Sequence, residues 1–569
     1  MNHTISKHIK EWSQSPFCKS TQKELSILKN NKVDLHDSFY KNLEFGTGGM
    51  RGLMGVGTNR INKYTIGKNT QGICNFINTN YKKNKKAVVA FDCRNNSEAF
   101  AKVVADVFSA NKIKIFLFSS LRPTPELSYA VRKLGCICGI VLTASHNPPK
   151  YNGYKVYWED GGQITPPIDQ KLINEIEKVD YNEINFKRKK KLIEIIDHKI
   201  DKAFIKLCLK NGLNTEVRNR HNNKIIFTAL HGTSSVIVPS LLKKAGYDSV
   251  KYVESQMKPD GNFSSVKSPN PEEIESFNLA IKLAEKENAE MVIGTDPDAD
   301  RLGVAVRDLN NNLRLINGNQ LMVLMFDYFL KLRKLKETLN KNFFIASTIV
   351  STPMVKKIAE YYNVDCKLCL TGFKWIAKMI KDFSNKNFII GGEESFGIMI
   401  NDDVRDKDAI TATLAAYEMM SYYKQNNSSV FKELVKLYCI HGFFKEKLIS
   451  IVKNGKKGQE EIEEILNRFR SKPPTNIGGS KVKYFNDYFI LISKNLISKK
   501  QIKINLPQSN VIEFETVDKF KLVLRPSGTE PKIKIYISVN SDLKSLEKYN
   551  KVEKKLDEKL NQIISEIGL

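Results

Sequence analysis

The sequence predicts an α/β fold of three similar doubly wound α/β domains with mainly parallel mixed sheets, followed by a C-terminal α+β domain. Three observations predict this fold. Apolar strands and helices alternate in three successive rounds, which favours parallel sheets covered by helices. In each round the last strand runs into an unusual polar loop. After the polar linker Gln425–Ser429 this alternation ends, and several strands follow one another.

Length and composition bound the class of protein. A chain of 569 residues is too long for one core, and we predict domains at 1–205, 206–316, 317–440 and 441–569. Hydrophobic residues make up 41% and charged residues 27%, as in soluble globular proteins. No apolar run reaches the ~18 residues of a membrane span. The N-terminus lacks the apolar core of a signal peptide, so we expect a cytoplasmic protein.

Charge and cysteine content exclude further classes. The net charge of +28 comes from lysine spread over the whole chain rather than clustered in a stripe, so we expect no nucleic-acid partner. A basic surface still attracts anionic small molecules. The nine scattered cysteines imply no disulfide framework. Composition leaves open whether the protein is a monomer or a dimer, and no membrane partner is expected.

The N-terminal region leads into a glycine-rich loop. Residues 1 to about 40 read as polar helices with Trp12 as a candidate apolar anchor. The following stretch, Phe45-Gly-Thr-Gly-Gly-Met-Arg-Gly52, forces tight bends or close approach of a ligand. Arg51 in this loop suits an oxyanion, because its planar guanidinium binds oxygen pairs.

The first round ends in a loop that carries a serine and a histidine. The buried, β-branched strand Ile137–Leu142 precedes Thr143-Ala-Ser-His-Asn-Pro-Pro149. The two prolines forbid helix and further sheet pairing, so the chain must turn. Ser145 and His146 are therefore presented at the carboxyl end of a strand, where α/β sheets bind ligands. The earlier elements of this round are strands Ala87–Phe91 and Ile113–Phe118 and helices Ser97–Ser109 and Pro125–Leu134.

The second round ends in three closely spaced carboxylates. Asp296, Asp298 and Asp300 follow the strand Met291–Gly294, and Pro297 argues against regular structure. Crowded carboxylates repel unless a cation holds them, and oxygen-only ligands suit Mg²⁺. An acidic solvated turn is the alternative. The preceding elements are strands Ile225–Leu230 and Val250–Val253 and helices Val236–Ala245 and Ile274–Glu287.

The third round ends in a glutamate-rich loop. Glu393, Glu394 and Ser395 lie among glycines after the strand Phe388–Ile390. Their oxygens suit the vicinal hydroxyls of a sugar, although two glutamates also fit an acid/base pair. The earlier elements are strands Phe343–Ile349 and Lys367–Leu370 and helices Pro353–Tyr362 and Lys374–Phe383.

The C-terminal domain carries a fourth special loop, between strands Lys521–Leu524 and Lys532–Ser538. Arg525, Ser527, Gly528 and Thr529 offer a guanidinium, two hydroxyls and accessible backbone N–H groups, which together fit a phosphate. The other predicted elements are helix Gln459–Arg470, strands Phe485–Ile492 and Val511–Phe514, and a last helix at Leu543–Ile567. The four loops together describe phosphoryl transfer on a sugar phosphate.

These loops resemble the signature loops of the α-D-phosphohexomutases. The matching segments occur in the family's order and span most of the chain: Thr143-Ala-Ser-His-Asn-Pro148, Asp296-Pro-Asp-Ala-Asp-Arg301, Glu393-Glu-Ser-Phe-Gly397 and Arg525-Pro-Ser-Gly-Thr-Glu-Pro531. The glycine-rich loop with Arg51, together with Asn152-Gly-Tyr-Lys155 and Val404-Arg-Asp-Lys-Asp408, resembles the phosphoglucomutase-2/phosphopentomutase-like branch.

The resemblance implies a mechanism and residue roles. Ser145 would carry the phosphoryl group as phosphoserine, and Mg²⁺ would be held by Ser145, Asp296, Asp298 and Asp300. The reaction would interconvert glucose 1-phosphate and glucose 6-phosphate through a sugar 1,6-bisphosphate. Arg51 and Lys155 are candidates for charge stabilisation and proton transfer near Ser145, and His146 is a further candidate base. Lysine acts as a base only if its pKa is lowered, and a nearby Mg²⁺ and arginine would lower it. Substrate contacts would come from Arg301, Lys374, Glu393, Ser395, Arg525, Ser527, Gly528 and Thr529.

Three alternatives stay open at this point. A phosphomannomutase or phosphopentomutase would use the same loops and mechanism. A Mg²⁺-dependent sugar phosphatase would pass the phosphoryl group to water, but a sugar loop and a separate phosphate loop serve to retain a bisphosphate. Arg301 could instead form only a structural salt bridge that braces the aspartate loop.

Overall fold

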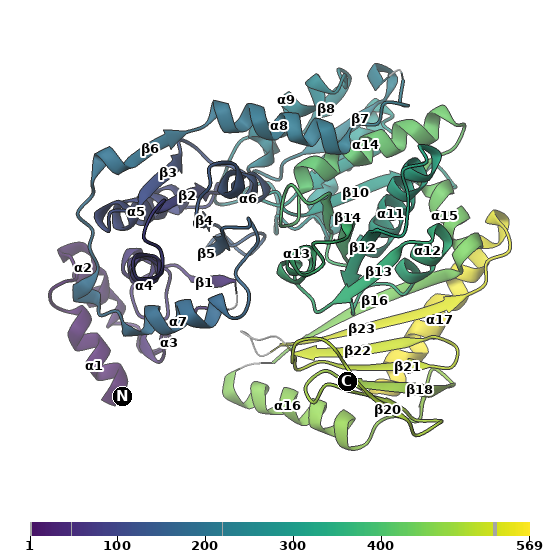
Figure 1. The fold of residues 1–569 in the computed structure, drawn as a ribbon. Coiled ribbons are helices and arrows are strands. Elements are labelled where there is room, and N and C mark those ends of the chain that lie inside the picture. Colours follow the sequence, from purple (N-terminus) through teal and green to yellow (C-terminus); the bar gives the residue numbers. More distant parts are fainter. Residues whose placement is uncertain (1–2, 47, 219, 454, 527–531, 569) are drawn as a thin grey trace.

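The computed structural model describes residues 3–46, 48–218, 220–453, 455–526 and 532–568. Figure 1 shows three α/β units and a C-terminal sheet, with the N-terminal unit at the left and the C-terminal sheet below the third unit. The predicted fold class is confirmed: the first three sheets mix parallel and antiparallel strands, and the last is antiparallel. None of the helices in the described residues is long and apolar enough to cross a bilayer.

The first sheet has apolar cores on both faces. Along β2, Val88 and Ala90 pack with the core under α6, whereas Ala87 and Val89 pack with the core on the other face, as the period of two in a strand requires. In sheet order the strands are β1 (Gly49–Leu53), β5 (Tyr151–Trp158), β4 (Cys138–Leu142), β2 (Lys86–Phe91), β3 (Lys114–Phe118) and β6 (Ile193–Ile196). The helices are α4 (Lys63–Asn80), α5 (Ser97–Ala110), α6 (Thr124–Lys133), α7 (Ile168–Lys178) and α8 (His198–Gly212).

The N-terminal segment forms α1 (His3–Trp12), α2 (Lys19–Leu28) and α3 (Lys32–Phe39), as predicted. Trp12 is fully buried and contacts the rings of Phe17, Phe39 and Tyr64. Because Tyr64 belongs to α4, this aromatic cluster attaches the three helices to the first domain.

The second and third sheets repeat the same plan with an antiparallel hairpin at one edge. The second contains β11 (Leu313–Ile316), β10 (Leu302–Arg307), β9 (Met291–Thr295), β7 (Ile225–Thr228) and β8 (Val250–Tyr252), with α9 (Ser234–Lys244) and α10 (Asn278–Glu287). The third contains β13 (Asp365–Cys369), β12 (Phe343–Thr348), β14 (Asn387–Glu393) and β15 (Gly397–Ile400). Its helices are α11 (Gly318–Leu335), α12 (Met354–Tyr362), α13 (Phe373–Asp382), α14 (Ala409–Gln425) and α15 (Val430–His441).

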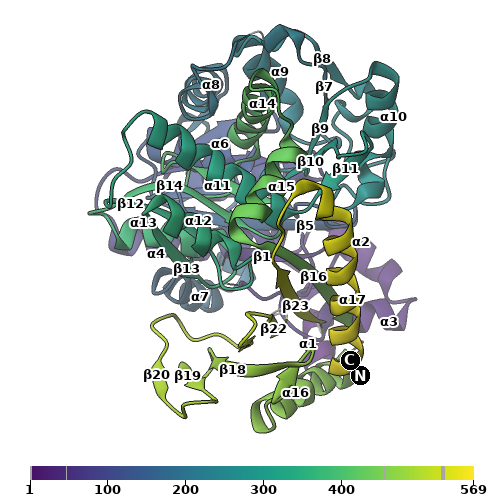
Figure 2. The same cartoon turned by 90° about the vertical axis from the view of Figure 1, so that its right-hand side faces the viewer.

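The C-terminal domain is an antiparallel sheet with α17 along it (Figure 2). Its strands run in the order β16 (Phe443–Val452), β23 (Lys532–Ser541), β22 (Lys521–Pro526), β21 (Ile512–Thr516), β18 (Ser480–Asp487), β19 (Ile492–Asn495) and β20 (Gln501–Lys503), and β17 (Asn476–Ile477) pairs with β18. The helices are α16 (Gly455–Ser471) and α17 (Tyr549–Ile567).

Two predicted elements in this domain are wrong in their bounds. A single strand at 485–492 is replaced by a turn between β18 and β19, because Asp487 accepts the Phe489 N–H and Leu491 takes a positive φ of 57°. The last helix begins at Tyr549 rather than Leu543, because Ser545 is extended and a short 3₁₀ turn precedes the helix.

The predicted domain boundaries remain predictions. The boundary at 205/206 falls within α8, whereas the boundaries at 316/317 and 440/441 fall just before α11 and at the end of α15. The apolar core of the second sheet is continuous with those of the third and the C-terminal sheets, whereas the first sheet has cores of its own.

Candidate active site

The serine of the first polar loop is buried against the aspartate loop. Ser145 follows β4, has a positive φ of 49°, and is only 3% exposed. Its N–H donates to Thr143 Oγ1 at 2.9 Å, which closes the turn. Its Oγ donates to Asp296 Oδ2 at 2.6 Å. The fold therefore places a candidate nucleophile directly on a carboxylate that lies 151 residues away in the sequence.

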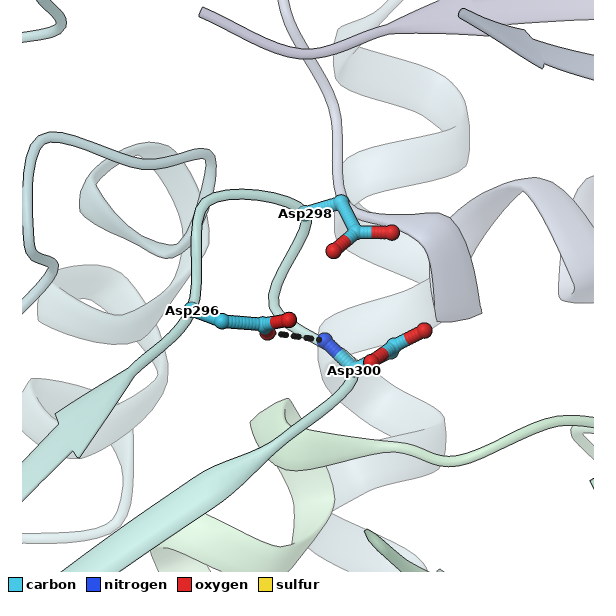
Figure 3. Close-up of side chains that lie close together, drawn as sticks. All are labelled: Asp296, Asp298 and Asp300. Carbon is cyan, nitrogen blue, oxygen red and sulfur yellow. Dashed lines mark hydrogen bonds between the residues drawn. The ribbon is translucent and has the colours of Figure 1, made fainter. Parts of the chain in front are cut away.

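The three aspartates converge on one point (Figure 3). All are buried, and one carboxylate oxygen from each lies within 4.8 Å of the others. Asp296 Oδ1 accepts the N–H groups of Asp300 and Arg301 at 3.0 Å, so the loop folds around its own carboxylate. Oδ1 of Asp298 and Oδ1 of Asp300 have no hydrogen-bond partner within the described residues. Buried, unpartnered carboxylate oxygens fit a hard cation such as Mg²⁺.

Two lysines neutralise part of this charge. Lys155 Nζ, on β5, lies 2.6 Å from Asp298 Oδ2 and 2.9 Å from Asp300 Oδ2. Lys407 Nζ lies 3.2 Å from Asp300 Oδ2. Burial alone would raise the pKa of Asp300, but these two ammonium groups hold it below its usual range. Burial and the other two carboxylates raise the pKa of Asp296.

The carboxylates around Lys155 act against the lowered pKa that Mg²⁺ and arginine would give it. Burial opposes its charge, but Asp298, Asp300 and Asp406 outweigh burial and raise the pKa of Lys155. In this arrangement the Lys155 ammonium neutralises carboxylate charge.

Arg51 and His146 flank the serine. Arg51 Nη1 donates to Asn147 Oδ1 at 2.9 Å. His146 Nδ1 lies 3.4 Å from Ser145 Oγ. Burial, with the positive charges of Arg301 and Arg51, holds the pKa of His146 well below its usual range. The imidazole is therefore neutral, and burial with the two arginines disfavours its protonation.

Arg301 makes the ion pair that sequence analysis left open. Its Nη1 lies 2.5 Å from Glu272 Oε1, and its Nε lies 3.9 Å from Asp300 Oδ1. The side chain thus braces the aspartate loop, and it is 22% exposed.

The glutamate loop lies beside the N-terminus of α13. Glu393 Oε1 accepts the Gly372 N–H at 2.6 Å, and burial together with Glu394 raises the pKa of Glu393. Burial lowers the pKa of Lys374, on α13, to about 8. Ser395 is partly exposed in the same loop.

The C-terminal sheet faces this loop. Arg525 lies at the end of β22, and its positive charge opposes the burial that raises the pKa of Glu394. Ser527, Gly528 and Thr529 lie outside the described residues. A cavity of about 850 Å³ adjoins the glutamate loop, with Glu394, Phe396, Val523 and Tyr536 in its lining.

Sequence reasoning missed two side chains of the site. Thr124 begins α6 and donates from Oγ1 to Asp298 Oδ2 at 2.8 Å. The signal was available, because Thr124 follows β3 at the same sheet edge as the serine loop. Lys407 lies in the Val404–Asp408 segment, which the sequence analysis used only for its resemblance to one branch of the family.

Family models and a curated relative match most of the chain. Models of the phosphoglucomutase/phosphomannomutase α/β/α domains I, II and III match residues 42–183, 202–310 and 317–438. A curated phosphoglucomutase of Staphylococcus aureus is 37% identical over 522 residues, which is 90% of this chain and 92% of the relative.

Solved structures agree in fold. A phosphoglucomutase/phosphomannomutase family protein of Burkholderia thailandensis matches with a TM-score of 0.65 at 15% identity, covering 92% of this chain and 97% of that one. The open form of the Paramecium phosphoprotein parafusin, a phosphoglucomutase, matches with a TM-score of 0.65 at 18% identity, covering 89% and 91%.

Proposed function

The chain belongs to the phosphoglucomutase/phosphomannomutase family, and from this premise we propose that it is a phosphoglucomutase that interconverts glucose 1-phosphate and glucose 6-phosphate. The observation that carries the proposal is the contact of Ser145 Oγ with the buried aspartate cluster. A serine needs charge neutralisation to exchange a phosphoryl group, and this cluster is where a divalent cation would supply it. We assign Mg²⁺ to Asp296, Asp298, Asp300 and the Ser145 oxygen.

The chain's own residues support a two-step transfer. The phosphoryl group on Ser145 passes to a free hydroxyl of the bound sugar monophosphate, giving a sugar 1,6-bisphosphate. His146, whose Nδ1 lies 3.4 Å from Ser145 Oγ, is the candidate that takes the proton of that hydroxyl, while Lys155 and Arg51 neutralise the transferring group. After the bisphosphate reorients in the site, its other phosphoryl group is transferred to Ser145, and the proton returns to the sugar oxygen that this group leaves.

Two further sets of residues favour keeping the bisphosphate intermediate bound over losing a phosphoryl group to water. Glu393 and Ser395 offer acceptors and a hydroxyl for the sugar, and Lys374 adds a positive charge beside them. Arg525, with Ser527, Gly528 and Thr529, would hold the phosphate that is not reacting. Because this grip must serve both orientations, it recognises phosphate, and the choice of sugar falls to the glutamate loop. A cytoplasmic location and a monomeric or dimeric state stay predictions from the sequence.

Phosphorus NMR of the purified protein tests the proposal. The protein is given Mg²⁺, a trace of sugar bisphosphate and, in parallel, glucose 1-phosphate, mannose 1-phosphate or ribose 1-phosphate. We expect the glucose 6-phosphate signal to grow fastest. Faster conversion of mannose or ribose 1-phosphate would replace the substrate assignment and keep the mutase. Inorganic phosphate as the main product would refute the mutase and identify a phosphatase.

A further inference from the structure

One buried arginine outside the predicted site donates hydrogen bonds to several backbone carbonyls of the serine loop, residues 145–151. Arg94 follows β2 in the stretch Asp92-Cys93-Arg94, and it is 3% exposed. Its guanidinium donates to four carbonyl oxygens, those of Ser145 (2.5 Å), Asn147, Pro148 (3.0 Å) and Tyr151 (3.1 Å). Neither the sequence motifs nor the family loops assign this residue a role.

The serine loop supplies few donors of its own: the Tyr151 N–H donates to the Pro148 carbonyl at 3.0 Å, and the Asn147 N–H donates to the Ala144 carbonyl at 3.1 Å. Pro148 and Pro149 have no N–H groups, and the Ser145 and Asn147 carbonyls accept from Arg94. A positive φ at a serine is unfavourable unless its surroundings over-determine it. The planar fork of one guanidinium can satisfy several carbonyls at once, which the round ammonium of a lysine cannot.

The arginine is itself held from two sides. Asp92 Oδ2 lies 3.4 Å from Arg94 Nε, and Asp92 Oδ1 accepts the Arg94 N–H at 2.9 Å and Ser97 Oγ at 2.7 Å. On the other side, the Phe263 ring of the second domain lies 5.0 Å from the guanidinium. Phe263 is 1% exposed, so the guanidinium packs against a buried ring.

We propose that Arg94, covered by Phe263, is a positioning residue that sets the backbone of the Ser145 loop so that Ser145 Oγ meets the aspartate cluster. The inference rests on the proposed function, because it concerns the same nucleophile. It also implies that the conformation of the Ser145 loop depends on the position of the second domain, because that domain carries both Phe263 and the aspartates. Arg94 touches no reacting atom, and it acts through the backbone of residues 145–151.

The test compares Arg94→Lys with Arg60→Lys. Arg60 is a matched control: it is 8% exposed in the same domain and donates to the carbonyls of Asp37 and Asn59 and to the Asp37 carboxylate, away from the serine loop. We expect Arg94→Lys to lower kcat about 100-fold, because a displacement near 1 Å costs about that much. The KM should stay within about twofold, because the sugar and phosphate loops are untouched. Arg60→Lys should leave both constants unchanged.

Two outcomes would overturn the proposal. Wild-type kcat in folded Arg94→Lys would show that a positive charge suffices and that the fork is not needed. Equal losses of kcat in both variants, following equal losses of thermal stability, would show that Arg94 only supports the fold. If Arg94→Lys does not fold, Phe263→Leu takes its place. Removing the aromatic cover should lower kcat about tenfold with KM unchanged, and an unchanged kcat would refute the role.

Crystal structures separate this proposal from the proposed function. In Arg94→Lys we expect Ser145 to leave the positive-φ region and its Oγ to move out of hydrogen-bond distance of Asp296. An unchanged backbone of the Ser145 loop would overturn the positioning role of Arg94 even if activity fell. If the wild-type protein converted no sugar phosphate, the proposed function would fail, while the two structures would still decide whether Arg94 sets the loop.

Discussion

Replacing Thr124 by valine removes one hydroxyl that links two domains at the aspartate cluster. Thr124 Oγ1 donates to Asp298 Oδ2 at 2.8 Å, and the Thr124 N–H donates to the Asp298 carbonyl at 2.9 Å. Both residues are fully buried. Valine keeps the shape and the backbone bond, so the change isolates a single hydrogen bond to a buried carboxylate.

The expected loss follows from that bond. A hydrogen bond to a charged group contributes about 1.5–3 kcal/mol. Lys155 still donates to the same oxygen at 2.6 Å, so we expect the lower part of this range. Every 1.4 kcal/mol is tenfold in affinity, and outer contacts of metal ligands are typically worth about 10- to 100-fold. We therefore predict a Mg²⁺ affinity about tenfold weaker than in the wild type.

Isothermal titration calorimetry with Mg²⁺, alongside the Mg²⁺ dependence of mutase activity, measures this loss. The matched control is Ser109→Ala on α5 of the same domain, whose buried Oγ donates to the Asp106 carbonyl at 2.9 Å and accepts the Lys189 N–H at 3.2 Å, away from the aspartates. The control should bind Mg²⁺ like the wild type. Equal Mg²⁺ affinity in Thr124→Val and the wild type would refute the reasoning that α6 orients Asp298 for the metal.

Three further predictions concern the same site. Ser145→Ala should abolish conversion of glucose 1-phosphate and the phosphoserine mass shift seen after incubation with glucose 1,6-bisphosphate; mutase turnover by this variant would contradict the assignment. Arg525→Ala should raise the KM for glucose, mannose and ribose phosphates alike, and steady-state kinetics that showed a change for one sugar only would count against a pure phosphate grip. Burial lowers the pKa of Lys374 to about 8, so its positive charge is present below that pH and lost above it, and the KM should rise as the pH passes 8. Lys374→Met should show a high KM with no such pH-dependent rise. An identical rise in that variant would assign the titration to another group.

The sequence alone predicted the parts of the site that depend on local pattern. Buried apolar strands have a recognisable composition, and the prolines and glycines after them mark where the chain must turn. Ser145, Asp296 and Glu393 could therefore be placed at carboxyl ends of strands from these patterns. The N-terminal helices and the change to an antiparallel sheet were predicted in the same way. The bounds near Asp487 and Ser545 were wrong, because single side-chain hydrogen bonds and single extended residues interrupt patterns that otherwise continue.

The charge states and partners of these side chains were decided by tertiary structure. Mg²⁺ and arginine were expected to lower the pKa of Lys155, yet three carboxylates from two other loops surround it and raise that pKa. Lys407 and Thr124 carry no catalytic signature in the sequence, and they reach the aspartates only because helix α6 and the segment before α14 pack against the second sheet.

Sequence by itself thus determined which residue types stand at the ends of which strands, because a strand and its turn are local and repeat with a short period. The contact of Ser145 with Asp296 was decided only by the docking of the first domain onto the second. The ion pair of Arg301 with Glu272 and the hydrogen bonds of Arg94 to the serine loop were decided by packing within the second and the first domain. These pairs lie 151, 29 and 51 residues apart. No local period encodes such separations; they depend on how several buried faces pack at once.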